Sequence, residues 1–206
     1  IRLAKSAAKH ARKLSAFSMV AAASIQVAEI LLVLENTRHI HKYIAEARKM
    51  LNLGMIPSLM LKTFIIEIRN HLLHTRIRRA QAVLEKAERF VDKYDLRMVE
   101  TLELRRCRAD IVAIVGKPFD AIRSYENIID DAERMRANAI YADTWRVLGT
   151  LQFKLEENDK AFRSWNIALG LAQETNDVCL HANLLCDIAD GAIMIHALKT
   201  ARSVCE

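Results

Sequence analysis

The stretch from Trp145 to Ala172, WRVLGTLQFKLEENDKAFRSWNIALGLA, decides the fold of this 206-residue chain. Its polar run Glu156-Glu157-Asn158-Asp159 is a short turn between two apolar segments, as expected for a connection between helices. Small and aromatic residues on both sides of the turn follow the spacing W-x2-L-G-x11-A-x3-W-x2-A: Trp145, Leu148, Gly149, Ala161, Trp165 and Ala168. The stretch therefore predicts a hairpin of two helices.

The positions of Ala161 and Gly149 recur along the whole chain at intervals of 40 or 41 residues. The first column contains Ile40, Ala80, Ala121, Ala161 and Ala201. The second column lies twelve residues upstream and contains Ala28, Ile68, Ala109, Gly149 and Ala189. A period of this length is typical of a solenoid, in which each helical hairpin buries its apolar face only by stacking on its neighbours.

The spacing of the Trp145 unit resembles a tetratricopeptide repeat (TPR). The resemblance implies that Trp145 and Leu148-Gly149 lie on the first helix, that Ala161 marks the helix crossing, and that Trp165 and Ala168 pack on the next hairpin. Second helices of the other units keep a seven-residue apolar span: Ile40, Ile44 and Ala47; Ala80, Leu84 and Ala87; Ala121, Tyr125 and Ile128.

The match to the family is weaker outside that unit. Arg105 and Arg108 stand where Trp145 and Leu148 are expected, and the usual Pro after the second helix is absent. Units of about forty residues resemble the longer repeats of rapsyn, of a spindle-orientation adaptor and of the bacterial maltose-regulon activator.

Helical periodicity without strand alternation predicts an all-α protein. Apolar residues from Ala121 to Ala132 follow one face of a 3.6-residue helix, and Gly and Pro together number only seven. We expect a right-handed α-solenoid of antiparallel helix pairs, with about five units. It would form a single domain over residues 1–206 and belong to a longer array.

Charge is unevenly distributed along the chain. Residues 1–80 hold 14 Lys and Arg against 4 Asp and Glu, whereas residues 81–206 hold 17 against 21, which gives the net charge of +6. A basic half is compatible with nucleic acid, a membrane surface or an acidic partner, and equally with an ordinary solvated face. The tight basic clusters are Arg76-Ile77-Arg78-Arg79 and Arg105-Arg106-Cys107-Arg108, and neither is interleaved with aromatic residues.

The apolar segment from Ala16 to Leu34 has the length of a bilayer span. Glu29 and Gln26 within it, and the register of Ala28 with Gly149, favour a buried solenoid helix. We therefore predict no transmembrane segment.

Cysteine and histidine spacing gives no sign of a metal site. Four cysteines form no C-x2-C pair, which predicts reduced thiols and an intracellular protein, cytoplasmic or nuclear. The pairs His39-x-His41 and His71-x2-His74 lack a third ligand. No glycine-rich phosphate loop, nucleophile elbow or dinucleotide fingerprint occurs, so we expect neither an enzyme nor a cofactor.

In TPR arrays the first helix of each unit lines a concave groove, so the resemblance implies a set of groove residues in register with Gly149. Those expected to contact a partner are Lys62, Arg69, Arg106, Asp110, Arg146, Thr150, Phe153 and Asn183; the same register includes Ile65, Leu72, Glu103, Ala113, Asp143, Cys186, Asp190 and Ile193. This set lacks the run of Lys and Asn residues that forms the carboxylate clamp of chaperone-binding TPR domains.

Two arrangements of the groove charges are open. Arg69, Arg106 and Arg146 recur one unit apart and could form a ladder for the acidic or amide groups of a peptide. Alternatively, acidic groove residues neutralise these arginines internally.

The predicted function is a protein–protein interaction scaffold that holds a partner segment or complex subunit in the groove. Alternatives are a regulatory array on a longer enzyme or transcription activator, or a nucleic-acid or membrane contact through the basic half. Self-association is also open, since the end of such an array exposes apolar residues such as Leu3, Ala7 and Leu14.

Overall fold

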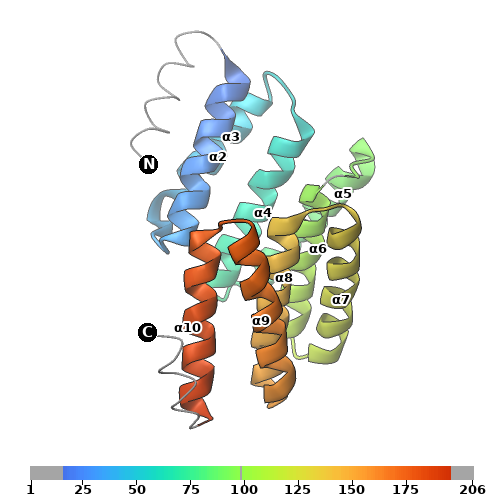
Figure 1. Cartoon of the computed structure of the whole chain (residues 1–206). Helices are drawn as coiled ribbons and strands as arrows, with labels where there is room; N and C mark the ends of the chain where they lie inside the picture. Colours follow the sequence, from blue (N-terminus) through green and yellow to red (C-terminus); the bar gives the residue numbers. More distant parts are fainter. Residues whose placement is uncertain (1–15, 98, 196–206) are drawn as a thin grey trace. The chain divides into compact units, whose positions relative to one another are not determined.

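The computed structural model describes residues 16–97 and 99–195, and every regular element in them is helical (Figure 1). The elements are α2 (Phe17–Val33), the 3₁₀ helix η1 (Thr37–His39), α3 (Ile40–Leu51), α4 (Pro57–Leu73), α5 (Ile77–Tyr94), α6 (Val99–Ile114), α7 (Pro118–Arg134), α8 (Asn138–Lys154), α9 (Asn158–Glu174) and α10 (Val178–Met194). The fold is an all-α helical repeat, as predicted. Leu3, Ala7, Leu14, Ala201 and Cys205 lie outside the described residues.

The chain divides into two compact units, Ile1–Ile111 and Val112–Glu206, so the boundary falls within α6. We name the first helix of each repeat the A helix (α2, α4, α6, α8, α10) and the second the B helix (α3, α5, α7, α9). Within the first unit α2 packs on α3 and α4 on α5, and within the second α8 packs on α7, α9 and α10.

Both columns of the repeat are buried wherever the structure describes them. The exposed fractions are at most 7% for Ala28, Ile68, Ala109, Ala189, Ile40, Ala80, Ala121 and Ala161, and Gly149 is buried too. The forty-residue interval in the sequence is therefore the interval of the helix packing.

Turns between the helices, except the one between α3 and α4, repeat the same backbone geometry. After α2 the amide of Asn36 donates to the carbonyl of Leu31, and that of Glu35 donates to Leu32, which is the Schellman ending of a helix. The residue in the left-handed region is glycine at only one of the seven such positions in the described residues: Glu35, Thr75, Asp95, Gly116, Arg136, Glu156 and Asn176. Gly116 is the exception.

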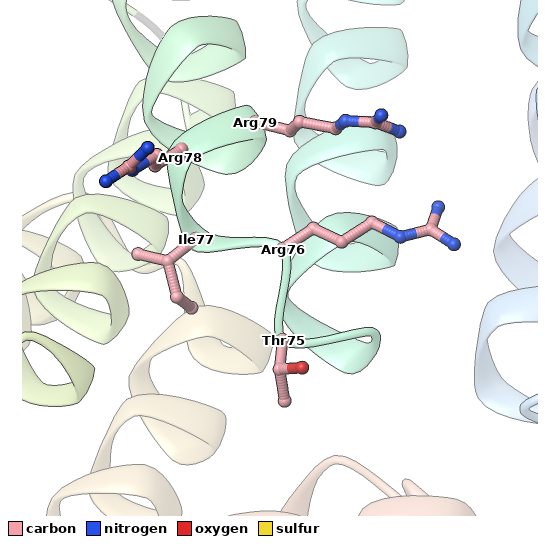
Figure 2. A pocket seen from close by; sticks show the side chains of 5 residues that line it. All are labelled: Thr75, Arg76, Ile77, Arg78 and Arg79. Carbon is pink, nitrogen blue, oxygen red and sulfur yellow. The ribbon is translucent and has the colours of Figure 1, made fainter.

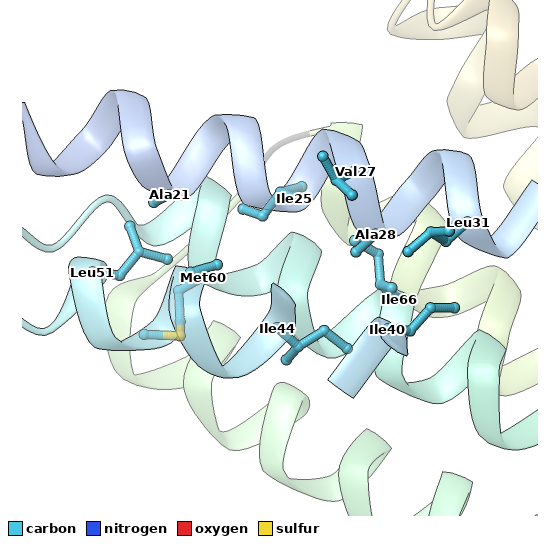
Figure 3. Packing of buried hydrophobic residues seen from close by; sticks show 11 residues of the cluster. Ala21, Ile25, Val27, Ala28, Leu31, Ile40, Ile44, Leu51, Met60 and Ile66 are labelled. Carbon is cyan, nitrogen blue, oxygen red and sulfur yellow. The ribbon is translucent and has the colours of Figure 1, made fainter. Parts of the chain in front are cut away.

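In the first unit α4 contributes to two cores on different sides. Met60 and Ile66 join a cluster with residues of α2 and α3, among them Ala28, Ile40 and Ile44 (Figure 3). Leu61, Ile65 and Ile68 join a second cluster with apolar residues of α5 and α6. A helix that is buried on two sides is what stacking of hairpins requires.

Trp165 of α9 is the centre of the core in the second unit. Its ring lies 5.5 Å from Phe153 and 5.4 Å from Phe162, centroid to centroid, and its Nε1 donates to the carbonyl of Arg146 at 3.2 Å. A Cβ atom on Gly149 would stand 2.6 Å from Trp165 Cδ1, closer than atoms can pack. Gly149 is therefore required for the approach of α8 to this indole.

The remaining predicted packing residues are buried or half-buried as well. Leu148, Ala168 and Tyr125 are buried, with exposed fractions of 2%, 0% and 1%. Trp145 is half-buried and meets Tyr141 edge to face.

Candidate functional site

The eight predicted partner-binding residues all lie on A helices. Lys62 and Arg69 are on α4, Arg106 and Asp110 on α6, Arg146, Thr150 and Phe153 on α8, and Asn183 on α10. In each compact unit, we name those of these residues that it holds, together with the acidic residues that pair with them, the A-helix face of that unit.

In the first unit charged residues of three A helices gather on the A-helix face. Arg69 Nη2 on α4 donates to Glu103 Oε2 on α6 at 3.4 Å, and both side chains are about 30% exposed. Glu29 on α2 is also within electrostatic reach of Lys62, Glu103 and Arg69. Partial burial raises the pKa of Glu29 above its usual value, and repulsion from Glu103 adds to this, while Lys62 and Arg69 oppose it.

Arg106 differs from the other predicted groove arginines because its side chain is buried, with an exposed fraction of 7%. It lies beside Cys107, whose thiol is fully buried. Burial raises the pKa of Cys107 to about 11, despite the nearby guanidinium groups of Arg69 and Arg106. This thiol is protonated at neutral pH, so it is not a nucleophile.

In the second unit an ion pair joins neighbouring A helices in the same way. Arg146 Nε on α8 donates to Asp187 Oδ2 on α10 at 2.6 Å. Thr150 Oγ1 donates to the Arg146 carbonyl, which also accepts from Trp165. The core tryptophan therefore fixes the backbone from which this ion pair extends.

Phe153 and Asn183 occupy different environments. Phe153 packs against Trp165 and Phe162, so much of its ring contributes to the core. Asn183 is exposed on α10, as are Cys186 and Asp190. The solvent-exposed residues of the A-helix face in this unit are therefore on α10.

Arg69 and Arg146 are paired internally, which answers the question of the arginine ladder for these two positions. Glu103 was one of the expected neutralising residues. Asp187 was not expected to neutralise an arginine, although it follows Arg146 by 41 residues, which is one repeat interval.

Sequence reasoning also missed a polar cluster between α3 and α4. Arg48 Nη2 donates to Glu67 Oε2 at 2.7 Å, its Nε donates to Thr63 Oγ1 at 2.9 Å, and its guanidinium lies over the ring of Phe64. Arg48 and Glu67 are distant in sequence, and no pattern in the repeat links them.

No helix within residues 16–97 and 99–195 has the length and apolar character needed to cross a membrane. In the same residues no three His, Cys, Asp or Glu side chains come together as a metal site would require.

Comparison with known proteins gives a structural neighbour. No protein-family model and no curated protein matches the chain. The fold is similar to the crystal structure of BtubC (BKLC) from P. vanneervenii, with a TM-score of 0.68 and 16% sequence identity, over 98% of this chain and 85% of that chain. At this identity the likeness shows the helical-repeat fold alone.

Proposed function

We propose that this chain is a TPR-like scaffold that binds segments of a protein partner on the A-helix face of each unit. The observation that carries the proposal is the pairing of charged residues between successive A helices, Arg69 with Glu103 and Arg146 with Asp187. Such pairs form where A helices lie side by side and present a polar surface, which is the arrangement that TPR arrays use to hold peptides.

In each pair, a group of a bound peptide can take the place of the internal acidic side chain. Each side chain in them is between 24% and 31% exposed, so a peptide carboxylate or amide has access to the guanidinium groups. Because these ion pairs are partly exposed to water, which weakens the attraction between their charges, a contact with a partner can replace them.

Apolar surface accompanies the charges on α10. Ile193 is 52% exposed on the helix that also carries Asn183 and Asp190. A partner segment with polar groups and an apolar anchor fits such a surface, because apolar burial supplies affinity and the polar contacts supply register.

The proposal is tested by affinity capture with the variant Asn183→Arg/Asp190→Arg, followed by mass spectrometry of the captured proteins. Its matched control is Asn166→Arg/Glu174→Arg, which alters exposed positions on the B helix α9 and changes the net charge equally. We expect a set of partners that the control retains and the A-helix variant loses.

A second variant separates binding from folding. Exchanging the charges in Arg146→Asp/Asp187→Arg keeps an ion pair between α8 and α10, so the thermal stability changes little while the charges that a partner meets are altered. Equal capture by all variants and by the original chain would rule out the A-helix face.

A further inference from the structure

The turn between α4 and α5 carries the most concentrated exposed positive charge in the first unit. Thr75, Arg76, Ile77, Arg78 and Arg79 line an open pocket of about 370 Å³ (Figure 2). All three arginines are exposed. Figure 2 shows Arg76 and Arg79 extending to the same side of the turn and Arg78 to the other.

The side chains of these arginines are not paired with acidic side chains, as those of several other basic residues are. Within the described residues, no ion pair or hydrogen bond involves the side chain of Arg76, Arg78 or Arg79. In the second basic cluster, by contrast, Arg108 Nε donates to Glu88 Oε1 at 2.8 Å. The α4–α5 turn therefore keeps its charge available.

A neighbouring turn adds to the same surface. Thr37 Oγ1 of η1 lies 3.0 Å from His74 Nε2 at the end of α4, which brings the two turns together. Arg38 follows Thr37 and is exposed. We name Arg38, His74, Arg76 and Arg79 the basic turn patch; Arg78 extends to the other side of the turn (Figure 2).

The field of this patch acts on His71 of α4. Partial burial lowers the pKa of His71, and the positive charges of Arg76, Arg79 and His74 lower it further, whereas Glu67 opposes them. The positive charges of Arg76, Arg79 and His74 thus all influence the same imidazole, that of His71.

The placement of these arginines is unfavourable for the helix that carries them. The first turn of α5 has no acidic residue, whereas α7 and α9 have Asp120 and Asp159 there. Positive side chains at a helix N-terminus oppose the helix dipole. Binding of negative charge at the patch would relieve this repulsion.

We propose that the basic turn patch is a second docking surface, separate from the A-helix face, for an acidic segment of a protein partner. Planar guanidinium groups pair bidentately with carboxylates, and Arg76 and Arg79 on one side of the turn offer two of them to adjacent acidic residues. No Phe, Tyr or Trp stands in the two turns that form the patch, residues 34–39 and 74–79, so the large aromatic side chains on which bases stack best are missing there.

The test measures fluorescence anisotropy of a labelled polyglutamate peptide with the whole chain. Arg76→Glu/Arg79→Glu should weaken binding about tenfold, the effect of losing two exposed charge pairs and gaining repulsion. The matched control Arg123→Glu/Arg163→Glu reverses two exposed arginines of α7 and α9 and should change affinity less than about twofold. Circular dichroism establishes that both variants keep their helices.

Two further measurements complete the test. Polyglutamate should raise the pKa of His71, followed by NMR, because bound carboxylates offset the arginines that lower it. Equal loss of binding in both variants would overturn the proposal, and so would an oligothymidine that binds the patch more tightly than polyglutamate, since the patch would then be a nucleic-acid surface. Either failure leaves the A-helix face untouched, because Asn183 and Asp190 take no part in this experiment.

Discussion

The helix crossing of α8 and α9 differs from that of α4 and α5 in how side-chain volume is divided between the two helices. In the second unit Gly149 leaves room for Trp165, whose indole would clash with any Cβ at that position. In the first unit the corresponding residues are Ile68 and Leu84, both in one core cluster. The position of Gly149 therefore holds a larger residue, Ile68, in the first unit, where the position of Trp165 holds the smaller Leu84.

This comparison shows that the combined volume at a crossing is constrained rather than either residue alone. Protein cores are close-packed, so a change on one helix must be matched by its neighbour. A sequence motif built on the Gly149–Trp165 pair consequently misses the Ile68–Leu84 pair, although both occupy the same place in the fold.

The largest expected effect is the loss of the tryptophan. Trp165→Ala should destabilise the chain by about 3–5 kcal/mol, because it removes the side chain around which Phe153, Phe162 and Gly149 pack. Leu84→Ala in the other crossing should cost about 2–5 kcal/mol. Urea denaturation of both variants ranks them, and a larger cost for Leu84→Ala would contradict the central place of Trp165.

A sharper test of volume matching replaces the Gly149–Trp165 pair by the Ile–Leu pair found between α4 and α5. Gly149→Ile alone should cost about 1–3 kcal/mol or more through overpacking against Trp165. Combined with Trp165→Leu, which recreates the pair found between α4 and α5, it should cost less than the sum of the single changes by about 0.5–3 kcal/mol. Additive effects would show that the two positions are independent.

The turns should respond in opposite directions to changes at their left-handed residues. Thr75 has a φ of 53° and is β-branched, so Thr75→Gly should stabilise the chain by about 1 kcal/mol. Gly116, with a φ of 91°, is the equivalent position one repeat later, and Gly116→Ala should destabilise it by about the same amount. Shifts of the same sign in thermal denaturation would refute equivalence of the two turns.

The smallest effect concerns the charge of Glu29. Its pKa is raised in the folded chain, so the folded state binds a proton more readily than the unfolded state. Its contribution to stability is therefore full below the unfolded value of 4.5 and is lost as pH rises through the folded pKa. Glu29→Gln should flatten the pH dependence of the unfolding free energy above pH 4.5; an unchanged slope would mean that Glu29 is fully solvated.

Sequence reasoning found the parts of the fold that depend on residue size and on turn-forming residues. The small columns marked the crossings, and Glu156-Glu157-Asn158-Asp159 marked the turn between α8 and α9. The turns at His74-Thr75-Arg76 and Met135-Arg136-Ala137 were not found, because backbone hydrogen bonds close them without glycine, proline or asparagine.

The candidate site was less accessible to prediction. Register alone placed Arg69, Arg106 and Arg146 on one face, but the direction of a side chain depends on the rotation of its helix within the stack. Arg106 is buried while Arg146 reaches Asp187 on the next A helix. Pairing between side chains forty residues apart leaves no local pattern. The chain forms two compact units, and the single domain expected over residues 1–206 stays a prediction.

Site-specific photo-crosslinking tests the central claim most directly. A photoreactive amino acid replaces Asn183 on the A-helix face in one protein and Asn166 on the B helix α9 in another, and both are exposed in cell extract. Our account predicts a discrete protein adduct at position 183 that is absent at position 166 and is lost when Asp190→Arg is added. Equal adducts at both positions, or adducts at position 166 alone, would contradict binding of a partner along the A helices.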